Sequence, residues 1–135
     1  MASQDEIFKG VVECVAKVVD AEPAGIKAGD RIIADLGADS LDLLDLIFQL
    51  EQRFNIRIKP RDIERRAQAE LDGAPMEIGG IYTPQALAQL RRVLPEVPPE
   101  ELHDKLMPSR LAYSFRVQTF VNLVARLLPE QHSLK

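Results

Sequence analysis

The segment from Ser40 to Phe54 constrains the fold more than any other part of the sequence, because its apolar residues recur at helical spacing on two sides. The wider stripe, suited to a domain core, comprises Leu43, Leu46, Ile47, Leu50 and Phe54, and the second comprises Leu41, Leu44 and Phe48. Asp39 is a favourable N-cap, and Asp42 stands where a capping box requires its acid. A helix with two apolar sides either has both sides buried within its own protein or contacts a partner protein with one of them.

The remaining sequence predicts further helices separated by turn-forming residues. Apolar periodicity places them at about 3–20, 60–71, 83–94, 99–107 and 111–128, with a long loop over 21–39. Pro95, Pro98 and Pro99 mark a boundary. We therefore predict an all-α fold, in which a four-helix bundle over residues 1–95 is followed by a helical C-terminal extension over 96–135. The apolar stripe of residues 111–128 is expected to pack on the bundle, because its exposure would be costly.

The charge of the chain is concentrated in its first half. Residues 1–58 contain 11 acids and six bases (net −5), whereas residues 59–135 contain 10 acids and 11 bases (net +1). A nucleic acid would require a basic face, so this distribution argues against nucleic acid as a partner. It favours protein partners with basic patches, since complementary electric fields speed their encounter.

Two further features bear on the class of protein. Cys14 is the single cysteine and lies among valines on a helical face, so we interpret it as core packing and expect neither an internal disulfide nor a zinc site. The longest uncharged apolar stretch, Val117–Ala125, is shorter than the roughly 20 residues of a membrane span. The N-terminus lacks the pattern of an export signal. We therefore expect a cytoplasmic, soluble monomer with no membrane span.

Ser40 is predicted at the first turn of the helix, where free backbone amides and the helix dipole favour an anion. A phosphodiester on its hydroxyl would be well placed there. Taken alone, such a serine is most simply a helix cap. A catalytic role is disfavoured, because a nucleophile elbow needs glycine at the positions of Ala38 and Asp42, and both histidines, His103 and His132, lie outside the predicted helix and its flanking loop.

The acidic residues around this helix could be considered as a metal site. The carboxylates Asp35, Asp39, Asp42 and Asp45 lack the alternating acids and the glycine of a calcium loop. We interpret them as a solvated face that meets a partner, and we predict no metal site.

The residues Leu36–Gly37–Ala38–Asp39–Ser40–Leu41 resemble the phosphopantetheine attachment motif of acyl carrier proteins. The helix that follows resembles the recognition helix of that family, and Phe54–Asn55–Ile56–Arg57–Ile58 resembles its usual close with Asn55 in place of glycine. The segment 39–54 is most similar to specialised carriers that deliver very long acyl chains to lipid A. Gln52 and Arg53 depart from the acids that many relatives carry, and about 40 residues after Leu94 are additional.

The resemblance implies a function and a set of site residues. A phosphopantetheinyl transferase, with magnesium, would attach 4′-phosphopantetheine to Ser40, between Asp39 and Leu41, and the arm would carry acyl groups as thioesters. Acyl synthases and acyltransferases with basic docking patches would dock on Leu41, Asp42, Leu44, Asp45, Phe48 and Glu51. The acyl chain would lie in a pocket lined by Leu43, Leu46, Ile47 and Leu50. The protein would itself catalyse no reaction.

Two questions stay open at this point. The implied pathway is fatty acid, specialised lipid (including lipid A) or polyketide synthesis, and the alternative function is a carrier-like structural or regulatory subunit of a larger complex. The second apolar stripe could be open for docking, or the additional C-terminal helices could cover it permanently.

Overall fold

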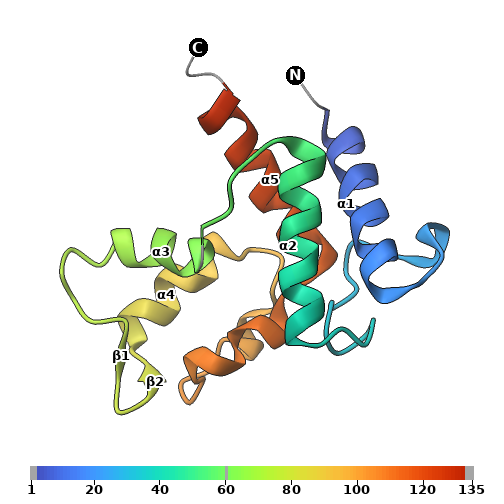
Figure 1. The fold of residues 1–135 in the computed structure, drawn as a ribbon. Helices are drawn as coiled ribbons and strands as arrows, with labels where there is room; N and C mark the ends of the chain where they lie inside the picture. The colour runs from blue at the N-terminus through green and yellow to red at the C-terminus, as the bar shows by residue number, and fades with distance from the viewer. Residues whose placement is uncertain (1–2, 60, 133–135) are drawn as a thin grey trace. The chain divides into compact units, whose positions relative to one another are not determined.

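The computed structural model describes residues 3–59 and 61–132, and most of its regular structure is helical. The α-helices are α1 (Gln4–Val19), α2 (Ser40–Phe54), α3 (Asp62–Ala69), α4 (Pro84–Val93) and α5 (Val117–His132) (Figure 1). Short 3₁₀ turns occupy Pro23–Gly25, Pro99–Glu101 and Pro108–Ser114, and β1 (Glu77–Ile78) pairs with β2 (Ile81–Tyr82) in an antiparallel hairpin. The predicted all-α class is confirmed, although the small hairpin was not predicted. Pro60, the predicted start of the third helix, lies outside the described residues.

The chain forms two compact units. One consists of the residues up to Ile58 together with those from Phe115 onward, and the other consists of residues 59–114. The division therefore differs from the boundary expected at residue 95, because the last helix shares a core with the first two. We call these units the carrier unit and the inserted unit.

Three helices, α1, α2 and α5, build the core of the carrier unit, and they stand side by side in Figure 1. Their most completely buried side chains are Val11, Val15, Leu46, Leu50, Val117, Val121 and Val124. The valines of α1 have a high intrinsic propensity for β-strands. Their helical spacing, however, places them on one apolar face, and burial of that face in the core stabilises the helix. Gly10 allows α1 to approach α2 closely, since a Cβ there would lie only 2.6 Å from the ring of Phe54.

Helix α5 begins later than the sequence predicts. Residues 111–114 form part of a 3₁₀ turn, and the α-helix starts at Val117. The reason lies in the residues between, where the Phe115 carbonyl accepts a hydrogen bond from the Ile32 amide (3.0 Å) and Arg116 forms an antiparallel bridge with Arg31. This pairing holds the backbone out of helical geometry. Residues of α5 belong to the same hydrophobic core as residues of α1 and α2.

Helices α2 and α5 run in the same direction. The Gln131 side chain, near the end of α5, accepts a hydrogen bond from the Arg57 amide (2.7 Å) and donates one to the Arg57 carbonyl (2.8 Å) just after α2 ends. The start of α5 instead meets the loop that precedes α2. The end of α2 and the start of α5 therefore lie at opposite ends of the carrier unit, and residues 59–114, the inserted unit, connect them in sequence.

The inserted unit has a core of its own. Helices α3 and α4 pack together, and the Tyr82 hydroxyl at the end of the hairpin donates a hydrogen bond to Glu64 of α3 (2.6 Å). The helix predicted at 99–107 is reduced to the 3₁₀ turn Pro99–Glu101. The Arg91 guanidinium, donating to the Leu102 carbonyl (2.7 Å), satisfies a backbone acceptor that a helix would otherwise use.

No helix in the described part of the chain is long and apolar enough to cross a membrane.

Replacing residues 59–114 with a flexible Gly/Ser linker should leave a cooperatively folding carrier unit, because the core of that unit contains none of these residues. The linker must span α5, about 24 Å for its 16 residues, and about 12 extended residues reach farther than that. Urea unfolding followed by circular dichroism, with the full chain as control, measures the outcome. A shortened chain without a cooperative transition would contradict the assignment of the core.

Candidate functional site

The start of α2 is fixed by two reciprocal hydrogen bonds. The Asp42 amide donates to the Asp39 carboxylate (2.9 Å), and the Asp39 amide donates to the Asp42 carboxylate (3.0 Å). This is the predicted capping box, and it is confirmed. Ser40 is consequently the first residue of the helix, and its side chain is exposed.

The residues before the capping box form a compact loop, residues 28–38, which we call the attachment loop. Asp35 accepts hydrogen bonds from the Arg31 amide (2.8 Å) and the Arg31 guanidinium (3.3 Å). Hydrogen bonds from the Arg31 side chain and then from its backbone lower the pKa of Asp35. Gly37 has a φ of 79°, which glycine adopts without strain. Ile32 and Ala38 are buried in the core, so the loop is anchored on both sides of its turn.

The first turn of α2 is a favourable position for a phosphodiester on the Ser40 hydroxyl. The hydroxyl is exposed, and the amides of a first helical turn carry partial positive charge with no partner inside the helix. Among the described residues, none forms a hydrogen bond with the Ser40 side chain, so no general base is paired with it. The Nε2 atom of His132 lies 2.7 Å from the carbonyl oxygen of Asn55, which follows the last residue of α2. His132 is therefore at the opposite end of α2 from Ser40, about 20 Å away from it.

The two sides of α2 have different environments. Leu46 and Leu50 are fully buried, and Leu43 and Phe54 are partly buried against the same core. On the other side, Leu41, Leu44 and Phe48 are 74%, 64% and 55% exposed. We call these three residues the outer stripe. Helix α5 packs in the core with Leu46 and Leu50, so it does not cover the outer stripe.

The acids near the outer stripe are not equally available. Asp39 and Asp45 are exposed, whereas Asp42 is half-buried and engaged in the capping box. Glu51 accepts a hydrogen bond from the Ile58 amide (2.9 Å) and is half-buried, so one of its oxygens holds the segment after α2 in place. No group of three or more acids, histidines or cysteines in the described chain could hold a metal ion. The carboxylates thus form an acidic face around apolar residues.

The four residues predicted to line an acyl pocket are buried to different extents. Leu46 and Leu50 are 1% and 0% exposed and pack directly in the core, while Leu43 and Ile47 are half-buried. An acyl chain would therefore enter only if these side chains moved apart. The pocket stays a prediction.

The surface between α1 and α2 holds a groove of about 210 Å³, lined by Glu13, Cys14, Lys17, Gln49, Gln52 and Arg53. Arg53 and Glu13 form an ion pair across it (2.7 Å), so one of the two residues that depart from the family pattern links the two helices. Cys14 is buried, and this burial raises the pKa of its thiol. The interpretation of Cys14 as core packing is confirmed.

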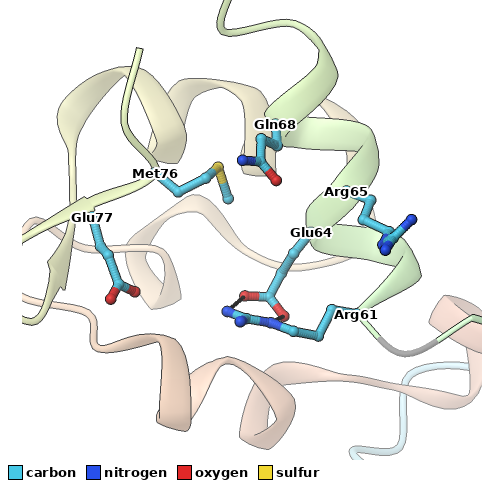
Figure 2. Close-up of a pocket in the computed structure, with 6 residues that line it drawn as sticks. All are labelled: Arg61, Glu64, Arg65, Gln68, Met76 and Glu77. Carbon is cyan, nitrogen blue, oxygen red and sulfur yellow. Dashed lines mark hydrogen bonds and ion pairs between the residues drawn. The ribbon is translucent and has the colours of Figure 1, made fainter. Parts of the chain in front are cut away.

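A second cavity, of about 260 Å³, lies in the inserted unit between α3 and β1 (Figure 2). Its lining consists of Arg61, Glu64, Arg65, Gln68, Met76 and Glu77. The Glu64 carboxylate is already engaged by the Arg61 guanidinium (2.9 and 3.2 Å) and by the Tyr82 hydroxyl. Burial and the hydrogen bond to Glu64 raise the pKa of Tyr82, so it stays a neutral donor. We interpret the hydrogen bonds among Arg61, Glu64 and Tyr82 as stabilising the inserted unit.

Sequence reasoning missed the segment that supports the attachment loop. The backbone of residues 115–118 hydrogen-bonds residues 28–32, and Gln131 holds the segment after α2. Backbone pairing between segments more than 80 residues apart leaves no periodic signal in the side chains.

Comparisons with known proteins match the part of the chain that contains α2. Residues 9–68 match the sequence model of the phosphopantetheine attachment site family. The chain is 35% identical to the acyl carrier protein of Thermotoga maritima over 65 residues, and the aligned region covers 48% of this chain and 80% of that protein. It is 41% identical over 70 residues to the acyl carrier protein of Campylobacter jejuni (52% and 86%) and 38% identical over 61 residues to that of Wolinella succinogenes (45% and 80%). No solved structure gives a significant match.

Asp39→Ala should destabilise the chain by about 1 kcal/mol, since it removes the side-chain acceptor of the capping box. Asp39→Asn keeps an oxygen acceptor and should cost less. Urea midpoints of the three proteins, measured at one pH, test this order. Equal midpoints for Asp39→Ala and the unsubstituted chain would show that the box does not fix the helix start.

Proposed function

This chain belongs to the acyl carrier protein family, and from that premise we propose that Ser40 is the residue to which its covalent 4′-phosphopantetheine is attached. The observation that carries the proposal is the exposed Ser40 hydroxyl at the capped first turn of α2. The preceding loop is held in the core on both sides of its turn, so a transferase meets a hydroxyl at a defined position. Members of the family are carriers and not enzymes.

The chain's own residues have separate tasks in this proposal. The first-turn amides of α2 favour the negative charge of a phosphodiester on Ser40, and the capping box keeps the helix from unwinding beneath it. The bound group supplies a thiol that holds acyl cargo as a thioester. The buried side of α2 keeps the helix fixed on α1 and α5, so that its outer side is presented to a partner.

We assign partner docking to the outer stripe and to the exposed acids beside it. Apolar side chains exposed to this extent and framed by carboxylates are typical of a surface that another protein covers. The acidity of residues 1–58 complements partners with basic patches, and such complementarity raises association rates. The engaged position of Glu51 makes it a weaker contributor than Asp45.

For the pathway, we propose the synthesis of fatty or specialised lipid acyl chains. The resemblance of segment 39–54 to carriers for lipid A favours that case. The alternative, a carrier-like structural or regulatory subunit, is favoured by one observation, namely that the chain holds an inserted unit which the carrier core does not need. Whether Ser40 is modified distinguishes the carrier function from the structural or regulatory one.

Ser40→Ala should abolish modification while leaving the fold intact, because the hydroxyl is exposed and has no partner among the described residues. The purified chain would be incubated with coenzyme A, magnesium and a phosphopantetheinyl transferase, and its intact mass measured. Ser109→Ala, which removes an exposed serine of the inserted unit, is the matched control and should be modified normally. A modified Ser40→Ala protein would refute the assignment.

Leu44→Arg should lower kcat/KM for the transferase by at least about tenfold, since it replaces an exposed apolar contact with a charge that repels a basic partner. Gln4→Arg places the same charge on the exposed start of α1 and should change kcat/KM by less than about twofold. Steady-state rates with both variants test the docking assignment. Equal losses for the two variants would instead indicate a general effect of charge.

A further inference from the structure

The attachment loop is held by the first turn of α5 through backbone hydrogen bonds. The Ile32 amide donates to the Phe115 carbonyl (3.0 Å) and the Val117 amide to the Asp30 carbonyl (3.0 Å). A third bond runs from the Gln118 amide to the Ala28 carbonyl (2.9 Å). Two of these donors belong to the amides that a helix start leaves without partners inside the helix, so α5 and the loop satisfy one another.

The support continues from the loop to the attachment residue. The Ile32 carbonyl accepts a hydrogen bond from the Ala38 amide (3.1 Å), and both residues are buried. Only Asp39, the N-cap of α2, separates Ala38 from Ser40. The position of Ser40 is therefore tied to Phe115 by two consecutive hydrogen bonds through Ile32.

Thr119 keeps the other end of this connection in place. Its side chain is 2% exposed, and its hydroxyl accepts a hydrogen bond from the Arg116 amide (2.9 Å). The Thr119 amide donates to the Arg116 carbonyl (3.0 Å). Both polar groups of the Arg116 backbone are thus held by Thr119, and Arg116 forms the bridge with Arg31 of the loop. A polar side chain so deeply buried is costly unless its hydrogen bonds are made.

We propose that the first turn of α5 positions Ser40 for modification, with Thr119 as a positioning residue that acts through Arg116, Phe115 and the attachment loop. This inference rests on the assignment of Ser40 as the attachment residue. It gives α5, which begins 77 positions after Ser40, a direct part in the site. Because its side chain is 2% exposed, Thr119 would act through these neighbours and not by contacting a transferase.

The test compares Thr119→Val, which keeps the shape and removes the hydroxyl, with Thr119→Ser, which keeps the hydroxyl. In the full chain, Thr119→Val should speed amide hydrogen exchange at Ile32 and Ala38 by about tenfold relative to Leu50, the equivalent of one hydrogen bond. It should lower kcat for Ser40 modification several-fold with little change in KM, since the outer stripe is unaltered. Thr119→Ser should restore both quantities to within about twofold.

Val117→Pro supplies a second variant in case Thr119→Val disturbs the core. Proline is favoured at the first helical position and removes the amide that donates to Asp30, while its apolar ring replaces the buried Val117 side chain in the core. It should also speed exchange at Ile32 and slow modification. Faster exchange with unchanged kcat in both variants would overturn the positioning role, as would unchanged exchange in both.

The two proposals fail differently. If the unsubstituted chain is not modified at Ser40, the proposed function fails and the positioning role fails with it. If the unsubstituted chain is modified and both variants are modified at the same rate, only the positioning role is overturned.

Discussion

The burial of α5 against α1 and α2 is the interaction on which the rest of the carrier unit depends. Val117, Val121 and Val124 are at most 1% exposed, and each contributes roughly 1.5 to 3 kcal/mol by leaving water. This packing occupies the inner side of α2 and leaves the outer stripe exposed. It also brings the first turn of α5 to the attachment loop, whose backbone it hydrogen-bonds.

The connection between α2 and α5 explains how an additional unit is accommodated. Because α2 and α5 run in the same direction, the chain leaves α2 and enters α5 at opposite ends of the carrier unit, and residues 59–114 connect these points with a core of their own. A unit that contributes no side chain to the carrier core can change in sequence without changing the core. The core of the carrier unit therefore does not depend on the sequence of the inserted unit.

Features encoded by local patterns were predictable from the sequence. The capping residues Asp39 and Asp42 and the left-handed Asn55 place both ends of α2 correctly, since each acts on its own neighbours. Apolar periodicity found the face of α2 that is buried. The start of α5 and the boundary at residue 95 were predicted differently from the structure, because backbone pairing between residues 30–32 and 115–117 is set by distant contacts. The hairpin at Glu77–Tyr82 is too short for any periodic signal.

The central proposal is that Ser40 carries phosphopantetheine in the working protein. Tandem mass spectrometry of peptides from the chain purified from its own host tests it most directly. The account predicts phosphopantetheine on the peptide that contains Ser40, with any further mass identifying the acyl cargo. An unmodified Ser40 in that protein, together with resistance to a transferase in vitro, would contradict the account and move the structural-subunit function to first place.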